Sequence, residues 1–154
     1  MKKFAFALMA TVATLFSLGF TSCSDDDDEP SFSENMIYGM WESDYYEYWA
    51  KYDGELESDQ FKGEFHNGRI YFGKDGTYKS YYKIGSEWVL EERAEWSFSG
   101  NKIIISYGEE DGYDKITIKT LTDIKLELES YLKEYDEDEG DVEVYKYITL
   151  HKVN

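Results

Sequence analysis

The strongest constraint on the fold is an alternation of apolar and polar residues that is broken at regular intervals by turn sequences. Side chains with a period of two lie on one face of a strand, so each alternating stretch predicts a half-buried antiparallel strand. The clearest stretches are Trp88–Phe98, Ile103–Tyr107, Ile116–Ile118, Leu126–Leu132 and Val142–Leu150. The turns between strands are predicted at Asp53-Gly54, Asn67-Gly68, Asp75-Gly76, Ser99-Gly100-Asn101, Asp111-Gly112, Thr122-Asp123 and Glu139-Gly140-Asp141.

This pattern predicts an all-β domain with about eight strands at hairpin spacing, which favours a closed barrel or a sandwich. We expect the strands at roughly residues 37–50, 69–73, 77–84, 87–98, 102–107, 114–120, 124–135 and 142–152. The segment from Ala50 to His66 fits a loop, a helical turn or an irregular strand. A barrel of eight strands has room inside for side chains or for one small ligand.

The N-terminus is typical of a targeting segment. Met1-Lys2-Lys3 is positively charged, Phe4–Phe20 is apolar and uncharged, and small residues precede the only cysteine, Cys23. This order indicates a secretory signal over residues 1–22. The alternative is a membrane-spanning helix, for which an apolar run of about 17 residues is at the lower limit of length.

The end of this segment resembles the lipobox of bacterial lipoproteins. Leu18-Gly19-Phe20-Thr21-Ser22-Cys23 has small residues before the cysteine, although Phe20 stands where a strict lipobox has leucine. The resemblance implies that Cys23 is acylated and becomes the first residue of the mature chain, with a second lipid chain added for stable anchoring. The alternative is a free secreted protein with an unpaired thiol.

The next segment, Ser24–Pro30, contains a run of acidic residues that repel one another and keep the chain extended. It resembles the tether after the lipid cysteine in surface-exposed lipoproteins of Bacteroidetes-type bacteria, and its alternative is a plain solvated spacer. We therefore predict three parts: a signal peptide at 1–22, a lipidated cysteine with a flexible tether at 23–35, and one folded domain at 36–154.

Several motifs in that domain, taken in order, resemble lipocalins. Gly39-Met40-Trp41 has the Gly-x-Trp pattern at the start of a lipocalin barrel. The runs Ile70–Tyr78, Trp96–Ile103 and Ile118–Leu128 resemble successive segments of the lipocalin-like domains of bacterial lipoproteins. The resemblance covers about residues 37–152 and implies an antiparallel up-and-down barrel with Gly39 and Trp41 at its base. Lipocalins also have an arginine on the last strand that packs over the tryptophan, whereas this chain ends Leu150-His151-Lys152.

Aromatic residues are the candidates for ligand binding. On a strand, Tyr45, Glu47 and Trp49 face one way, while Tyr46, Tyr48 and Tyr52 face the other. Exposed aromatic rings offer apolar contact together with a polar group, which suits sugars or protein partners. The residues predicted to contact a ligand are Tyr46, Tyr48, Tyr81 and Trp88. The alternative is that these rings only fill pleated strands, which aromatic residues often do.

The composition argues against several other functions. A net charge of -17 opposes binding to nucleic-acid phosphates. One cysteine and two histidines exclude a thiolate cluster or a His-rich metal site, and we expect no metal and no cofactor. The acidic turns 109–111 and 134–141 lack the spacing of a calcium loop. His66 and His151 are poorly placed for a catalytic triad, and we expect no enzymatic activity.

Together these features predict a lipoprotein of the outer membrane that is exposed at the cell surface. Its lipocalin-like barrel is expected to bind a small apolar or glycan ligand. The alternative is an accessory subunit with a filled barrel core, whose aromatic surface binds another envelope protein.

Overall fold

A computed structural model describes residues 32–108, 112–136 and 140–154 of the chain. The predicted signal peptide, Cys23 and the acidic run that follows it lie outside these residues, as do parts of both acidic turns, at 109–111 and 137–139. Within the described residues, no helix has the length and apolar character needed to cross a membrane.

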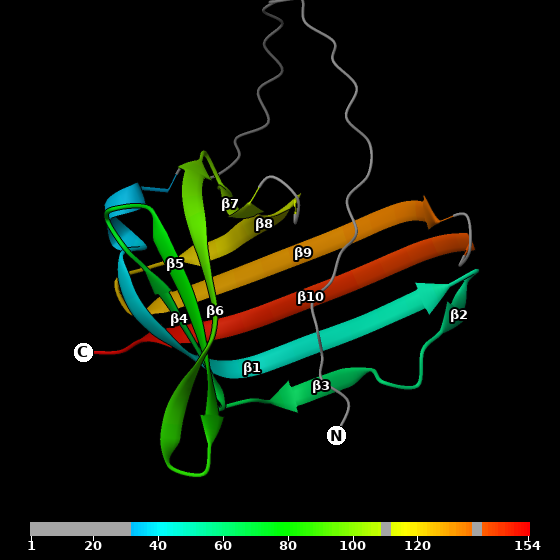
Figure 1. Cartoon of the computed structure of the whole chain (residues 1–154), viewed down its shortest axis with the longest axis horizontal. Coiled ribbons are helices and arrows are strands. Elements are labelled where there is room, and N and C mark those ends of the chain that lie inside the picture. Colours follow the sequence, from blue (N-terminus) through cyan, green and yellow to red (C-terminus); the bar gives the residue numbers. More distant parts are fainter. Residues whose placement is uncertain (1–31, 109–111, 137–139) are drawn as a thin grey trace, which may run out of the picture.

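The described chain forms one antiparallel sheet that closes on itself. The barrel strands are β1 (Gly39–Tyr52), β4 (Gly68–Phe72), β5 (Thr77–Ile84), β6 (Glu87–Ser99), β7 (Lys102–Gly108), β8 (Gly112–Leu121), β9 (Lys125–Asp136) and β10 (Gly140–Lys152). Each strand pairs with its neighbour in this order, and β10 pairs with β1 to close the barrel (Figure 1). The prediction of an all-β barrel with about eight strands is therefore confirmed.

The segment left open by the sequence contains two further short strands. β2 (Glu55–Leu56) and β3 (Phe61–Glu64) both pair with β1, on the edge that β4 leaves free. β4 itself pairs only with Gly39–Glu42 at the start of β1. One edge of β1 is thus shared among three strands. The single described helix is a short 3-10 turn, η1 (Glu34–Met36), that leads into β1.

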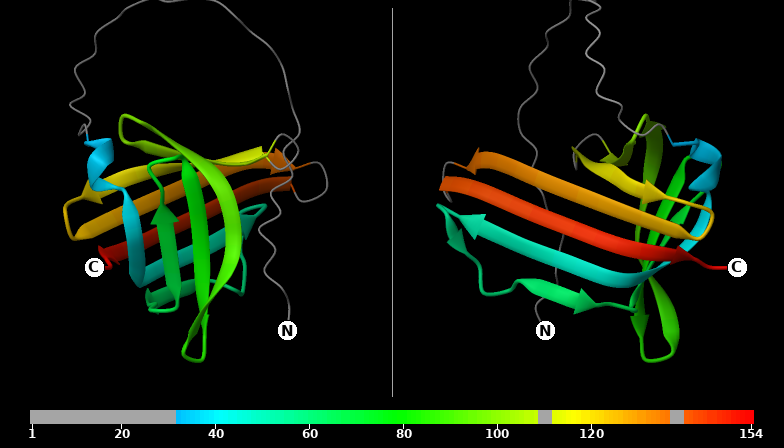
Figure 2. Two further views of the ribbon diagram at one scale, coloured as in Figure 1. Left: turned by 60° about the vertical axis from the view of Figure 1, so that its left-hand side comes forward. Right: turned by 180° about the vertical axis from the view of Figure 1, so that it is seen from behind.

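The barrel has two unlike halves as a result. At one end β4, β5 and β6 cross the long strands and complete the wall, while at the other end β9, β10 and β1 extend beyond them as a curved sheet (Figures 1 and 2). We call these the closed half and the open half. The buried core lies in the closed half and consists of Ile37, Trp41, Phe72, Tyr78, Trp96, Ile103, Ile105, Ile118, Leu121, Leu126, Leu128 and Leu150.

Candidate ligand-binding site

Trp41 fills the base of the closed half, as the Gly-x-Trp pattern implies. Its side chain is 0% exposed, and its Nε1 donates a hydrogen bond of 2.7 Å to the carbonyl oxygen of Ile37. Gly39 has a φ of +113°, a left-handed backbone conformation that favours glycine. A side chain there would also meet Lys152, because a Cβ atom would lie 3.3 Å from its Cε.

Lys152 lies over Trp41, in the position for which the last strand has no arginine. Its Nζ lies 4.7 Å from the centre of the Trp41 ring and donates a hydrogen bond of 3.0 Å to the carbonyl oxygen of Met36. An ammonium group over an indole ring is attracted by the electron-rich face of the ring. The lysine thus supplies a cation over the tryptophan, and the signal for it was the basic residue in the last strand.

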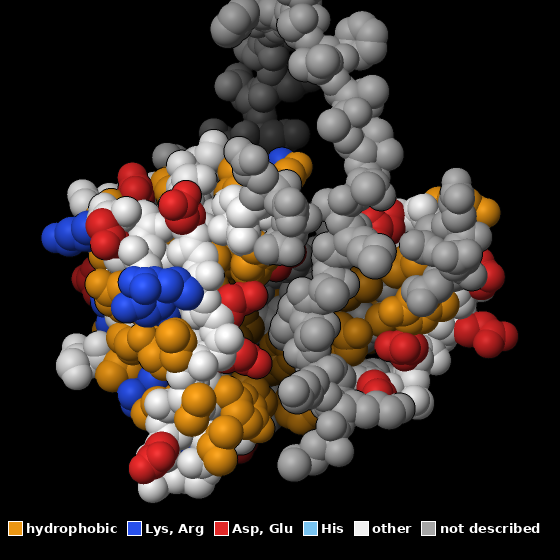
Figure 3. All heavy atoms as spheres, in the orientation of Figure 1, with side chains coloured by type: hydrophobic (Ala, Val, Ile, Leu, Met, Phe, Trp, Pro, Cys, Tyr) orange, Lys and Arg blue, Asp and Glu red, His pale blue; other side chains and the backbone are white. Residues whose placement is uncertain are grey.

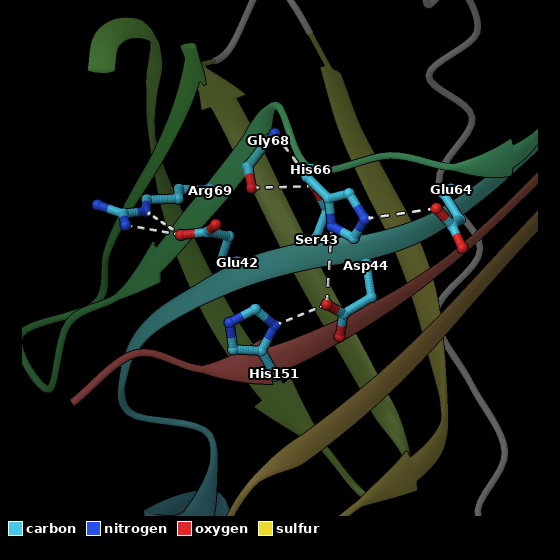
Figure 4. Close-up of polar contacts among 8 residues, drawn as sticks. All are labelled: Glu42, Ser43, Asp44, Glu64, His66, Gly68, Arg69 and His151. Atoms are coloured by element: carbon cyan, nitrogen blue, oxygen red, sulfur yellow. Dashed lines mark hydrogen bonds and ion pairs between the residues drawn. The ribbon is translucent and has the colours of Figure 1, made fainter. Parts of the chain in front are cut away.

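A β-bulge at Asp44 separates the two halves along β1. The pairing with β10 shifts between Ser43 and Tyr45, which inserts one extra residue into β1. Ser43, just before the bulge, is 0% exposed and holds β4 in place. Its Oγ donates to the carbonyl oxygen of Gly68 and accepts from the amide of Gly68, each at 3.0 Å (Figure 4).

Beyond the bulge, the inner face of β1 carries tyrosines instead of the buried core. Tyr46 pairs with Ile148 and Ala50 pairs with Val144, so Tyr46, Tyr48 and Ala50 share the face that points into the barrel. The Tyr46 ring stacks on Phe61 of β3 at 6.1 Å and lies 5.7 Å from Phe65. Burial raises the pKa of the Tyr46 hydroxyl to about 12, and the nearby Tyr48 makes a smaller contribution in the same direction.

These residues form what we call the inner trough: Tyr46, Tyr48, Ala50, Phe61, Phe65, Leu132, Val142 and Val144. Phe61 is still 41% exposed, because no strand of the closed half covers this part of the sheet. Figure 3, seen from the inner side, shows hydrophobic side chains gathered over the extended strands β9, β10 and β1. The trough offers apolar and aromatic contact to a ligand that enters the open half.

By strand parity, five polar side chains face the interior of the barrel, and we call them the interior polar cluster: Tyr78, Glu92, Tyr107, Asp114 and Lys146. Pairing places Glu92 opposite Ser80, Asp114 opposite the buried Ile105, and Lys146 opposite Tyr48. The Tyr107 hydroxyl donates a hydrogen bond of 2.9 Å to Oδ2 of Asp114. The members of the cluster come from β5, β6, β7, β8 and β10.

The other two predicted ligand contacts lie on the outside of the barrel. Tyr81 is the residue opposite Leu90, and Trp88 is the residue opposite Lys83, both at the far end of the β5–β6 hairpin. The Arg69 guanidinium lies 4.1 Å from the centre of the Trp88 ring, and Arg69 is also paired with Glu42 at 2.6 Å. The structure therefore brings Tyr46 and Tyr48 together in the trough but places Tyr81 and Trp88 on a different face.

The opposite face of β1 contributes to a second aromatic surface, on the outside of β9, β10 and β1. We call it the outer aromatic face, and it consists of Tyr45, Trp49, Tyr131, Tyr145 and Tyr147. The Trp49 and Tyr145 rings stack at 5.4 Å, and Tyr131 lies edge-on to Trp49 at 6.4 Å. Tyr131 is 54% exposed, so this face also presents aromatic surface to solvent.

Both histidines of the chain meet at the bulge, which sequence analysis did not foresee. His151 Nδ1 lies 2.8 Å from Oδ1 of Asp44, and His66 Nδ1 lies 3.9 Å from the same oxygen (Figure 4). The pairing of β1 with β10 brings His151 next to Glu42, beside the bulge. The neighbouring Ser43 hydroxyl is buried and bonded to Gly68, so it does not face these histidines as a nucleophile would.

No group of three or more His, Cys, Asp or Glu side chains among the described residues is arranged to hold a metal ion. The acidic turns considered for calcium lie partly outside these residues.

Comparison with known proteins agrees with this architecture. A family model described as a lipocalin-like domain matches residues 37–128. A lipocalin-like protein from Bacteroides uniformis superimposes with a TM-score of 0.50 and 15% identity, over 77% of this chain and 99% of that one. At this identity the likeness concerns the fold alone.

Two further solved structures superimpose with lower scores. An uncharacterized protein from Bacteroides eggerthii has a TM-score of 0.47 and 15% identity, over 76% of this chain and 99% of its own. The odorant-binding protein from bovine nasal mucosa has a TM-score of 0.43 and 16% identity, over 83% of this chain and 78% of its own. No curated protein matches the sequence.

Proposed function

Because this chain belongs to the family of lipocalin-like domains, we propose that it is a non-catalytic lipoprotein that binds a small apolar or glycan ligand in the open half of its barrel. The inner trough is the observation that carries this proposal. It presents aromatic side chains at Tyr46, Phe61 and Phe65, and Lys146 of the interior polar cluster lies opposite Tyr48 on the neighbouring strand. Ligand sites typically have this composition, in which apolar contact gives affinity and the polar groups fix orientation.

The closed half is unsuited to the same task, because its inner space is filled. Trp41, Phe72 and Trp96 pack there, with Phe72 5.0 Å from Trp96 between ring centres. The Trp96 Nε1 donates a hydrogen bond of 2.9 Å to the carbonyl oxygen of Gly73, which leaves this buried group satisfied. The described side chains inside the closed half thus pack against one another, and we place the ligand beyond the bulge at Asp44.

The test is to identify what the protein carries in its native cells. Lipoprotein purified from those cells is extracted with organic solvent, and the released molecules are identified by mass spectrometry. We expect one class of small molecule to be enriched, and Tyr46→Ser/Tyr48→Ser protein prepared in the same way to carry much less of it. Equal amounts from both proteins would contradict binding in the trough.

The anchor at Cys23 is the second part of the proposal. The lone cysteine after an apolar run supports acylation there, with the domain at the outer surface of the cell. Radioactive palmitate should label the wild-type protein and leave Cys23→Ser protein unlabelled. Protease added to intact cells should degrade the domain, whereas a protected domain would place it on the periplasmic side.

A second candidate function is supported by the outer aromatic face. Five aromatic residues on one side of β9, β10 and β1 are a suitable contact for another envelope protein. Crosslinking in intact cells, compared between wild-type and Tyr131→Ser/Trp49→Ser protein, tests this function. A crosslinked partner that disappears only in the variant would favour it over ligand binding.

A further inference from the structure

The charges inside the barrel specify the kind of ligand, an inference that rests on the proposed function of the trough. Three charged side chains of the interior polar cluster come from different strands: Glu92 from β6, Asp114 from β8 and Lys146 from β10. All three are only partly accessible to solvent. Their strand parity places all three on the inner face of the barrel, which therefore carries two carboxylates and one ammonium group from these residues.

The surroundings of Glu92 and Lys146 act on the charges of both groups. Burial raises the pKa of the Glu92 carboxyl, the charges of Asp114 and Glu91 raise it further, and Lys146 opposes them. Burial lowers the pKa of the Lys146 ammonium, and Asp114 and Glu92 counteract this effect. Tyr107 donates its hydroxyl hydrogen to Asp114, and a hydroxyl adds no positive charge. The cluster thus retains an excess of negative charge in partly desolvated surroundings.

We infer that the trough binds a small amphipathic organic cation, whose ammonium group lies beside Glu92 and Asp114 and whose apolar part rests on Tyr46, Phe61 and Phe65. A cation would neutralise the excess charge, and burial makes this attraction stronger than in water. An anionic ligand, such as a fatty acid, would instead place a third carboxylate near two others, which is unfavourable. A neutral ligand would make the apolar contacts but leave the excess charge as it is.

The experiment compares three ligands that share one apolar chain. Decyltrimethylammonium, 1-decanol and decanoate are titrated into the folded domain below their micelle concentrations, and binding is followed by tryptophan fluorescence and calorimetry. We expect the cation to bind at least about tenfold more tightly than the alcohol, and decanoate to bind most weakly.

Variants show whether the interior cluster causes this preference. Glu92→Gln/Asp114→Asn should lose the advantage of the cation while binding 1-decanol as before. The matched control is Glu64→Gln/Glu95→Gln, which removes the same charge at exposed positions of the outer surface and should keep the preference. Circular dichroism checks folding, and the single variant Glu92→Gln replaces the double variant if that variant does not fold.

The outcomes separate this inference from the proposed function. Equal or tighter binding of 1-decanol or decanoate overturns the inference and leaves a ligand-binding trough. A cation preference that survives in Glu92→Gln/Asp114→Asn, or that disappears equally in the control, also overturns it. If none of the three ligands binds, both the inference and binding of small apolar ligands in the trough fail.

Discussion

The closed and open halves of the barrel use the same strands for different purposes. On β1, the inward-facing Trp41 and Ser43 before the bulge are both at 0% exposure. After the bulge, the inward-facing Tyr46 and Tyr48 remain partly accessible and pair with β3, whereas Ala50 farther along is 0% exposed. One extra residue at Asp44 marks the change. We therefore expect the closed half to supply most of the free energy of unfolding, and the open half to bind the ligand.

The largest expected effect tests this division of roles directly. Trp41→Ala removes a fully buried ring from the closed half and should lower the free energy of unfolding by about 3–5 kcal/mol. Tyr46→Ala removes a partly accessible ring from the open half and should cost about 1 kcal/mol. Urea denaturation of both variants measures the difference. Similar losses would mean that the two halves support the fold equally.

A smaller effect is expected from the hydrogen bonds of Ser43, which connect β1 to Gly68 of β4. Ser43→Ala removes one hydroxyl that bonds both the carbonyl and the amide of Gly68. These backbone groups would lose their partner, which should cost about 1–3 kcal/mol. Ser130→Ala, on the inner face of the open half, is the control and should change stability by less than about 0.5 kcal/mol. Thermal unfolding of the two variants measures how much the Ser43–Gly68 hydrogen bonds contribute to stability, and equal stabilities would mean that they contribute nothing.

The barrel strands could be predicted from the sequence because alternation and turns are local signals. The barrel strands β4 to β10 begin and end within two residues of the expected ranges. The segment that contains β2 and β3 could not be assigned, since Glu55, Leu56 and Phe61–Glu64 show no regular alternation and form strands only by pairing with β1.

The candidate site was predicted only in part, for a related reason. The parity of β1 correctly separates Tyr46 and Tyr48 from Tyr45 and Trp49. Parity alone does not say which face is the inner one, nor that Trp88 lies outside beside Arg69. The interior polar cluster was missed altogether, because Glu92, Asp114 and Lys146 come together only when the barrel closes.

The pH dependence of stability sharpens the comparison within the open half. A raised pKa means that the folded protein holds the Glu92 proton more tightly than the unfolded chain does. This contribution to stability is present below the ordinary carboxyl value of 4.5 and is lost as the pH rises through the higher folded value. Glu92→Gln should therefore be more stable than wild type at pH 7, by less than about 1 kcal/mol after solvent screening.

The same variant should show no such advantage at pH 3.5, where Glu92 is protonated in both the folded and unfolded states. Unfolding by urea at the two pH values provides the measurement. An equal advantage at both values would attribute the effect to packing instead of charge.

The smallest effect is expected on the outer surface. Lys133 Nζ lies 2.9 Å from Oε1 of Glu143, and the lysine side chain is exposed. Lys133→Ala should lower stability by less than about 0.5 kcal/mol, because exposed ion pairs contribute little. The loss should shrink further in 1 M NaCl, where salt screens the pair. A loss above about 1 kcal/mol, measured by thermal unfolding, would show that the outer face supports the fold.

The most direct test of the account compares the two faces of β1 after the bulge. Tyr46→Ser/Tyr48→Ser changes the inner face, and Tyr45→Ser/Trp49→Ser changes the outer face of the same strand. Calorimetric titration of each folded variant with the molecule recovered from native protein measures its affinity. Loss of affinity by about tenfold or more in the inner variant alone is the predicted result. Unchanged affinity in the inner variant, with loss in the outer one, would contradict a binding site inside the barrel.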